Sequence, residues 1–240
     1  MNESVPAHAP AARPGRQLPA WASVLAVVAH PDDESFGLGA VIDRLAAGGA
    51  VVHILCYSHG EASTLNETRA DLRRAREQEL SRAGAELGAA SVTLLDYPDG
   101  RLSGVPPAEL AGHAAAAAAR GNADGLLVFD DTGITGHPDH RAATAAAVLA
   151  GRQTGQPVLA WALPQAVARQ LKAETGHDFA GQPPGQLDLC VRVSRSRQRR
   201  AALMHASQVS PGAVLWRRLQ LQGECEHLRW LVPPVAAPPG

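Results

Sequence analysis

The sequence predicts an α/β protein with a Rossmann-like three-layer fold, a mostly parallel sheet and a smaller C-terminal α/β extension. Short apolar runs rich in β-branched residues alternate with longer segments of helical spacing, as in strands joined by crossover helices. Polar segments that contain glycine follow several of these runs. In open parallel sheets such segments carry the functional site, at the carboxyl ends of the strands.

The expected strands and helices follow one another in regular order. Apolar runs predict strands of the main sheet at 24–28, 50–57, 91–96, 125–129 and 157–161, and strands of the extension at 187–193 and 228–232. Helical spacing predicts helices at 35–48, 68–87, 107–120, 140–149, 167–172 and 195–206. The Gly- and Pro-rich loop at 175–186 is compatible with either a substrate lid or an oligomer contact.

Chain length and the composition of the two ends predict one folded domain with disordered ends. The 240 residues suit a single α/β domain, which we expect to span 21–232. Residues 1–20 are rich in Ala and Pro and lack the apolar stretch of a secretory signal, so we expect a disordered leader there and a disordered tail at 233–240. No apolar run approaches the roughly 20 residues of a membrane-spanning helix.

The overall composition is that of an ordinary globular protein. Hydrophobic residues make up 45% of the chain and charged residues 19%, and the net charge is -1. This balance gives no bulk attraction to nucleic acid or to anionic membranes, so we expect neither as a partner. The three cysteines, Cys56, Cys190 and Cys225, are widely spaced, which favours neither a disulfide framework nor a cysteine zinc site. A reducing compartment, the cytoplasm, fits this usage best.

A dense cluster of potential metal ligands follows the first strand. The segment His30-Pro31-Asp32-Asp33-Glu34 comes directly after the apolar run, hence at the carboxyl end of a strand. Imidazole and carboxylate groups are ligands for zinc and other divalent metals. A plainer alternative is that Asp32 or Asp33 only caps the next helix. Such a cap would not need the histidine, so a metal site is favoured if a second source of ligands exists.

The segment His137-Pro138-Asp139-His140, after the fourth strand, supplies that second source. Loops after neighbouring parallel strands meet at one edge of the sheet, so both segments can reach one ion. His30, Asp33 and His140 would then form a three-ligand set with an open position for water, the pattern of catalytic zinc. Capping or packing would be the better explanation for one isolated histidine loop, but two such clusters at strand ends favour a metal site.

At these residues the sequence resembles the PIG-L/LmbE-like N-acetylglucosaminyl deacetylases, a family that includes the deacetylases of mycothiol and bacillithiol biosynthesis. The resemblance rests on the two motifs at 29–34 and 136–140 and covers roughly residues 24–208. It implies zinc held by His30, Asp33 and His140. It further implies Asp32 as general base and His137 as the group that steadies the oxyanion.

The resemblance also implies the reaction, which is removal of the N-acetyl group from a small molecule that contains N-acetylglucosamine. The resemblance leaves open the aglycone, which could be inositol, malate, a lipid or another sugar. It also leaves open the oligomeric state, and a homo-oligomer is possible. Another divalent metal could take the place of zinc, because two His and one Asp do not select sharply. Some family members carry an aromatic residue where Thr135 stands, so the help of a phenol is left open as well.

The residue types suit amide hydrolysis on chemical grounds too. Asp32 need not bind the metal, so it can take a proton from water and pass it to the departing nitrogen. A protonated His137 can stabilise the oxyanion. Glu34 and Asp139 are candidates to orient the ligands, and they are equally well explained as carboxylates at helix starts.

Candidate substrate-binding residues are Arg76, Asp99 and Glu61, because sugar hydroxyls need directional hydrogen bonds. Helical periodicity alone favours Arg76 as a surface charge on a solvated helix face, and only the family resemblance raises it. His205 is expected to be a satisfied helix-end histidine and not a ligand.

Two other classes of protein compete with the hydrolase. One is a non-catalytic sugar- or metal-binding protein on the same fold. The other is a nucleotide-binding Rossmann enzyme, which Gly37-Leu38-Gly39 after the first strand would suggest. Ile42 occupies the place of the third glycine in that fingerprint, and the carboxylates before it would repel a pyrophosphate.

Overall fold

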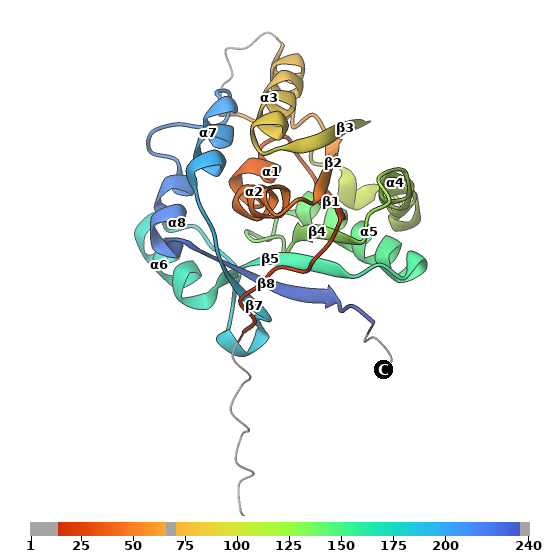
Figure 1. The fold of residues 1–240 in the computed structure, drawn as a ribbon. Helices are drawn as coiled ribbons and strands as arrows, with labels where there is room; N and C mark the ends of the chain where they lie inside the picture. Colours follow the sequence, from red (N-terminus) through yellow and green to blue (C-terminus); the bar gives the residue numbers. More distant parts are fainter. Residues whose placement is uncertain (1–13, 66–70, 236–240) are drawn as a thin grey trace, which may run out of the picture.

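The computed structural model describes residues 14–65 and 71–235, and in it a central sheet lies between layers of helices (Figure 1). The sheet has 8 strands in the order β3-β2-β1-β4-β5-β8-β7, and β6 pairs with β5. The strands are β1 (Ser23–Val28), β2 (Val51–Ser58), β3 (Ala89–Tyr97), β4 (Gly125–Phe129), β5 (Val158–Pro164), β6 (Gly181–Gln182), β7 (Leu189–Arg192) and β8 (Cys225–Val232).

The five strands from β1 to β5 run parallel, and β8 pairs antiparallel with both β5 and β7. This confirms the predicted α/β class with its mostly parallel sheet and its C-terminal extension. Strands β1 and β4 are direct neighbours. Because both run in the same direction, the segments that follow them emerge at the same edge of the sheet.

The helices are α1 (Asp33–Phe36), α2 (Gly39–Ala47), α3 (Leu72–Glu86), α4 (Pro107–Arg120), α5 (Pro138–Thr154), α6 (Gln165–Thr175), α7 (Ser196–Met204) and α8 (Val214–Gln222), with 3-10 turns η1 (Leu102–Gly104) and η2 (Pro184–Gln186). The helix predicted at 35–48 is split in two at Gly37 and Leu38. The helix predicted from residue 68 begins at Leu72, and residues 66–70 lie outside the described part of the chain. Helix α8 was not predicted.

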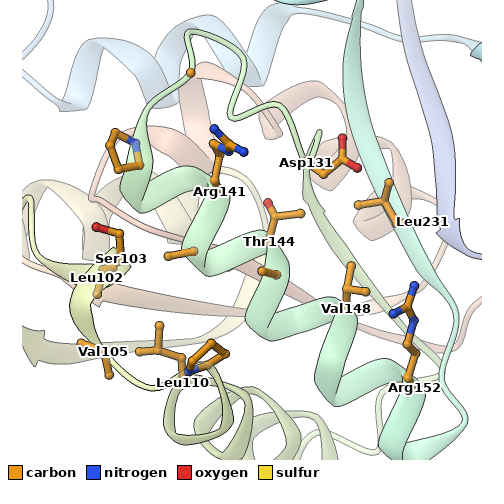
Figure 2. Close-up of a pocket in the computed structure, with 15 residues that line it drawn as sticks. Leu102, Ser103, Val105, Leu110, Asp131, Arg141, Thr144, Val148, Arg152 and Leu231 are labelled. Atoms are coloured by element: carbon orange, nitrogen blue, oxygen red, sulfur yellow. The ribbon is translucent and has the colours of Figure 1, made fainter.

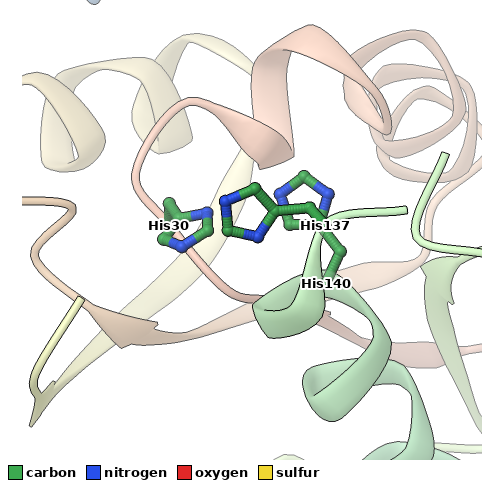
Figure 3. A group of neighbouring side chains, drawn as sticks. All are labelled: His30, His137 and His140. Atoms are coloured by element: carbon green, nitrogen blue, oxygen red, sulfur yellow. The ribbon is translucent and has the colours of Figure 1, made fainter. Parts of the chain in front are cut away.

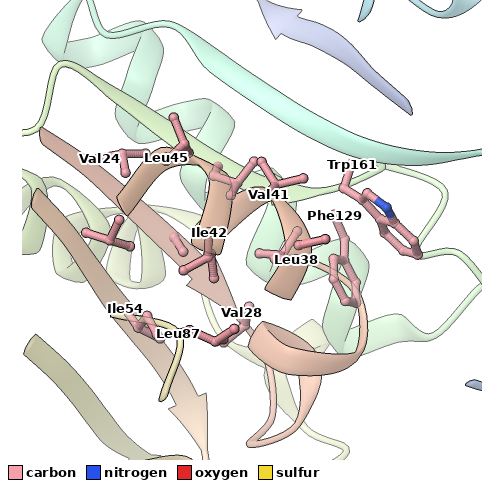
Figure 4. Packing of buried hydrophobic residues seen from close by; sticks show 14 of the residues in the cluster. Val24, Val28, Leu38, Val41, Ile42, Leu45, Ile54, Leu87, Phe129 and Trp161 are labelled. Carbon is pink, nitrogen blue, oxygen red and sulfur yellow. The ribbon is translucent and has the colours of Figure 1, made fainter. Parts of the chain in front are cut away.

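Apolar side chains form a core on each face of the sheet. Alternate residues of β1 point to opposite faces: Val24, Ala26 and Val28 join one core, and the residues between them join the other. Helix α2 packs its apolar residues on the first core, as Figure 4 shows. Helices α4 and α5 cover the second core with small side chains, mostly alanine. The alanine-rich helix at 107–120 therefore packs closely on the sheet.

The N-terminal end of the chain differs from expectation where it is described. Residues 1–20 were expected to be disordered, but the backbone of Gly15 pairs with the edge strand: its N–H donates to Asp188 O, and its carbonyl accepts from Cys190 N. Residues 1–13 and 236–240 lie outside the described residues. Within the described ranges, no helix is long and apolar enough to cross a membrane.

A disulfide bond joins Cys190 of β7 to Cys225 of β8, so the expectation that the cysteines form no disulfide is wrong. The two residues are 35 positions apart in the sequence, but they lie on neighbouring antiparallel strands with their Cα atoms 6.2 Å apart. Cys56 is a buried free thiol. Cysteine usage therefore does not favour a reducing compartment.

Candidate active site

Three histidines from the two motifs meet at the carboxyl edge of the sheet (Figure 3). His30 follows β1, His137 is the N-cap residue of α5, and His140 lies in the first turn of that helix. The ring centroids of His30 and His137 lie 4.9 Å apart, and those of His30 and His140 5.2 Å apart. The three rings offer nitrogen atoms that lie within 4.8 Å of one another. The structure thus brings together residues more than a hundred positions apart, as the sequence predicts.

Asp33 lies between two of these rings. Its Oδ1 is 3.1 Å from His140 Nε2, and its Oδ2 is 3.6 Å from His30 Nδ1. Ligand atoms roughly 2.0–2.2 Å from one zinc ion in tetrahedral geometry are separated by about 3.3–3.6 Å. Each of these two separations, which involve different oxygens of Asp33, is close to that of two ligands of one ion.

Hydrogen bonds on the far side of each imidazole leave the inner nitrogen free to bind a metal. His140 Nδ1 lies 3.2 Å from the carbonyl of Gly133, to which it can donate, so that Nε2 carries the lone pair toward Asp33. His30 Nε2 lies 3.0 Å from Asp99 and 3.3 Å from Asp139. Burial lowers the pKa of His30, but hydrogen bonds with Asp139, Asp33 and Asp99 outweigh it and raise the pKa to about 12. Without a metal, Nδ1 therefore carries a proton near neutral pH, which a bound ion would displace.

Asp139 is a fully buried carboxylate that fixes the position of His30. It accepts hydrogen bonds from the backbone N–H groups of Gly100 and Leu102, at 2.8 and 3.1 Å. Burial acts to raise the pKa of Asp139, but the bond to His30 and these two backbone bonds outweigh it, so the pKa is lowered. Asp139 therefore orients the imidazole of His30 through its outer nitrogen, as carboxylates commonly do for metal-binding histidines.

Asp32 is held apart from the cluster by an unusual backbone and by Arg76. Its φ of 110° lies in the left-handed region, which costs a non-glycine residue about 1–3 kcal/mol. The Arg76 guanidinium donates to the Asp32 carboxylate at 3.0 Å, to Gly60 O at 2.6 Å and to Pro31 O. Burial raises the pKa of Asp32 to about 6, although Arg76 acts to lower it. A carboxylate with this pKa can accept a proton near neutral pH.

The side chain of Glu34 holds the backbone of Asp32 in place. One carboxylate oxygen accepts the N–H of Asp32 at 2.9 Å, and the other lies 2.7 Å from His205 Nε2. Glu34 and His205 are both fully buried. His205 lies at the end of α7, as expected, but only its Nε2 is paired; its Nδ1 is buried without a hydrogen-bond partner among the described residues, so the expectation of a satisfied histidine is wrong for that atom. The sequence did not predict its pairing with Glu34, because the two residues are far apart in the chain.

His137 caps α5 through its Nδ1. Its Nδ1 accepts the N–H of Asp139 at 3.2 Å, so the ring proton lies on Nε2. Burial and the neighbouring imidazoles of His140 and His30 lower the pKa of His137. The sequence predicts a protonated His137, whereas the lowered pKa and the bond at Nδ1 favour a neutral imidazole with its proton on Nε2. His137 thus caps α5 and also lies in the histidine cluster.

The three predicted substrate-binding residues differ in how free their polar atoms are to bind a ligand. Arg76 is only 3% exposed, so it is neither a surface charge nor open to a sugar; it holds Asp32. Asp99 accepts the N–H of Ala62 at 2.9 Å in addition to its contact with His30. Glu61 Oε1 accepts the N–H of Asp99 at 3.0 Å, whereas Glu61 Oε2 is buried without a hydrogen-bond partner among the described residues. This unpartnered atom makes Glu61 the best placed of the three to bind a ligand.

A hollow of about 560 Å³ lies beside α5, between η1, α4 and the end of β8 (Figure 2). Its lining includes apolar residues such as Leu110, Val148 and Leu231, and none of the three histidines. Arg141 and Asp131 give it charge at one end. The hollow is thus separate from the residues that could perform chemistry.

The fold and the cluster together define a class of α/β proteins with a histidine and carboxylate site at the carboxyl edge of a parallel sheet. The family model of PIG-L, described as GlcNAc-PI de-N-acetylase, matches residues 25–150. The chain therefore belongs to the PIG-L family, which confirms the resemblance seen in the two motifs.

Individual relatives agree with this assignment. A 1D-myo-inositol 2-acetamido-2-deoxy-alpha-D-glucopyranoside deacetylase of Nakamurella multipartita is 32% identical, with 80% of this chain and 82% of the relative covered. A probable N-acetylglucosaminyl-phosphatidylinositol de-N-acetylase of Schizosaccharomyces pombe is 34% identical, over 59% of this chain and 57% of the relative. The chain thus spans little more than half of the second relative.

A solved structure supports the fold. The N,N'-diacetylchitobiose deacetylase of Pyrococcus horikoshii superimposes with a TM-score of 0.65. The alignment covers 89% of this chain and 85% of the other, at 19% sequence identity. At that identity the similarity extends to the arrangement of strands and helices.

Proposed function

We propose that this chain is a metal-dependent hydrolase that removes the N-acetyl group from a small molecule containing N-acetylglucosamine, with zinc as the metal. The observation that carries the proposal is the contrast between Asp33 and Asp32. Asp33 faces His30 and His140, whereas Asp32, the residue before it, is paired with Arg76. A metal-binding protein needs only the first arrangement, but a hydrolase also needs a free base beside the ligands.

His30, Asp33 and His140 would hold the ion. When bound, zinc would lower the pKa of a water molecule and polarise the carbonyl group of the amide. Asp32 accepts the proton of the attacking water on its carboxylate and later returns it to the departing nitrogen. Its pKa of about 6 suits both transfers near neutral pH. The named relatives, which are deacetylases of N-acetylglucosamine conjugates, support this reaction.

His137 stabilises the negative charge that develops on the carbonyl oxygen. Its neutral ring donates from Nε2, because Nδ1 is already used by the backbone of Asp139. Loss of one such donor typically costs about 3–4 kcal/mol of the barrier. On the opposite side of the cluster, Glu61 Oε2 and the Asp99 carboxylate would accept hydrogen bonds from the sugar hydroxyls.

The nucleotide-binding alternative is disfavoured by the surroundings of Gly37. A Cβ atom at this position would lie 2.2 Å from the ring of Phe129, so packing explains the glycine. The short helix that precedes it begins with Asp33 and Glu34, whose carboxylates would repel a phosphate group. A role in phosphate binding has no support at this turn.

Release of free amine from N-acetylglucosamine conjugates tests the proposal. Conjugates with inositol, malate, lipid and sugar aglycones are incubated with the zinc-loaded chain, with a chelator, and with zinc added back. We expect release that stops with the chelator and returns with zinc. Binding of a conjugate without release would instead indicate the non-catalytic class, and release that is indifferent to the chelator would exclude metal dependence.

A further inference from the structure

We infer that an apolar pocket beside the metal cluster holds the acyl chain of the substrate, and that it favours chains longer than acetyl. The inference rests on the proposed function, because it assigns the acyl side of the same amide bond. The pocket has a volume of about 200 Å³, and both Asp33 and His140 line it. We call it the acyl pocket; its apolar lining includes Phe36, Phe129, Ile134, Trp161, Phe179 and Leu215.

The acyl pocket and Glu61 lie on opposite sides of β1, as the acyl chain and the sugar lie on opposite sides of the amide carbon. The sheet order places β2 and β3, with Glu61 and Asp99 after them, on one side of β1, and β4 and β5 on the other. Phe129 ends β4, and Trp161 lies in β5 beside it, with their ring centroids 5.3 Å apart (Figure 4). An amide carbon carries the sugar nitrogen on one side and the acyl chain on the other. A sugar held at Glu61 therefore directs the acyl chain toward Phe129.

The wall of the acyl pocket is held in a strained conformation. Ile134 has a φ of 64°, which is rare for a β-branched residue, and it is only 7% exposed. Its carbonyl accepts the N–H of Ala180 at 2.6 Å, which ties the loop at 175–186 to the second motif. Phe179 of that loop and Thr135 also line the pocket. Strain of this kind is concentrated at ligand-binding sites.

The one charged group of the lining that lies outside the metal cluster is already engaged. Arg218 donates to Gln222 Oε1 and to the carbonyl of Phe36, and its guanidinium lies 4.8 Å from the centre of the Trp161 ring. It is 5% exposed. The nearby Glu226 carboxylate already acts on the charge of Arg218, which weakens its attraction for a second carboxylate. The pocket therefore fits an unbranched hydrocarbon chain better than a dicarboxylic one.

The size of the acyl pocket exceeds the needs of acetyl. A volume of about 200 Å³ is several times the roughly 30 Å³ that one water molecule occupies in the liquid. The acetyl methyl group would leave most of this apolar surface in contact with water. Each additional methylene that the pocket buries raises kcat/KM roughly fourfold. We therefore expect the highest kcat/KM for acyl chains of medium length, such as hexanoyl.

A chain-length series tests the inference. The zinc-loaded wild type is given N-acetyl-, N-butanoyl-, N-hexanoyl- and N-succinylglucosamine, and amine release is measured. We expect kcat/KM for hexanoyl to exceed that for acetyl at least about tenfold, and butanoyl to exceed succinyl. Hydrolysis of acetyl with equal or lower rates for hexanoyl would overturn the acyl pocket and leave the proposed function intact. Absence of hydrolysis for every substrate would overturn both.

Two further arms locate the effect. Val214→Trp fills the acyl pocket at a partly buried position, and it should lower the ratio of hexanoyl to acetyl turnover at least about fivefold. The matched control Val51→Trp lies at an exposed position of β2 and should keep the ratio of the wild type. Alkyl N-acetylglucosaminides of rising aglycone length form the second arm. If aglycone length raises kcat/KM and Val214→Trp removes that gain, the pocket belongs to the aglycone and the inference is wrong.

Discussion

The guanidinium of Arg76 lies 3.0 Å from the carboxylate of Asp32, in a position where Arg76 is almost fully buried. The same guanidinium donates to the carbonyls of Pro31 and Gly60. Arg76 thus holds both the side chain and the backbone of the proposed base. A charge that helical periodicity places in solvent is in fact part of the site.

We predict that Arg76→Lys lowers kcat about 10- to 100-fold, because an ammonium group cannot serve three acceptors in a fork. KM should change little, since Arg76 does not face the substrate. Steady-state kinetics with an N-acetylglucosamine conjugate measure the effect. Arg82→Lys, at an exposed position of the same helix, is the matched control and should behave as the wild type. A rise in KM at unchanged kcat would instead favour a direct contact with substrate.

Substitution of the base itself should separate metal binding from turnover. Asp32→Asn keeps Asp33, His30 and His140, so the purified variant should retain about one zinc per chain. Its kcat should fall about 10²- to 10⁴-fold, the range for loss of a general base. Metal analysis and amine release on one preparation measure both quantities. Full activity with retained zinc would exclude Asp32 as the base.

Asp130 gives a stability prediction that depends on pH. This buried carboxylate at the end of β4 accepts hydrogen bonds from Thr132, Gln182 and Arg229. Burial acts to raise its pKa, but Thr132 and Arg229 outweigh that effect, so the pKa is lowered. A lowered folded-state pKa adds stability above the unfolded value of about 3.9, and that stability is lost as the pH falls through the folded value.

Asp130→Asn should therefore lower the free energy of unfolding by about 1–3 kcal/mol at pH 7. The difference from the wild type should shrink as the pH falls below about 4, where Asp130 of the unfolded chain begins to bind a proton, and be lost below the lower pKa of the folded state. Urea unfolding at several pH values measures this. Asp178→Asn, in an exposed ion pair with Lys172, should change stability by less than about 1 kcal/mol. A difference that is independent of pH would contradict the role given to Asp130.

The disulfide predicts a thiol count and a loss of stability on reduction. Under denaturing conditions without reductant, a thiol reagent should modify only Cys56 among the three cysteines. Cys190→Ser should lower the free energy of unfolding by about 2–4 kcal/mol, because it opens the cross-link between β7 and β8. Three reactive thiols in the purified protein would show that the bond does not form in solution.

The sequence predicts the parallel half of the fold because each of its strands is one compact apolar run. It predicts the meeting of His30 and His140 because both follow such a strand. Helix α8 escaped prediction, since its arginines and glutamines weaken the apolar pattern. Strand β8 begins earlier than expected, at Cys225, because polar residues occupy its first half.

Contacts over long sequence distances could not be predicted. Arg76 and Asp32 are 44 positions apart, and His205 and Glu34 are 171 apart. Local sequence patterns do not reveal these pairs, because the partner that allows each charged group to be buried lies elsewhere in the chain. Arg195 is a further example, since it is buried and paired with Glu226 of β8, 31 positions away.

The central claim is that one metal ion is shared by His30, Asp33 and His140. Crystals grown with zinc, measured on both sides of the zinc absorption edge, locate the ion directly. We predict an anomalous peak roughly 2.0–2.2 Å from His30 Nδ1, His140 Nε2 and an oxygen of Asp33, with the Asp32 carboxylate free. A peak at His30, Asp99 and Asp139 instead, or at Cys190, Cys225 and His227, would contradict this account.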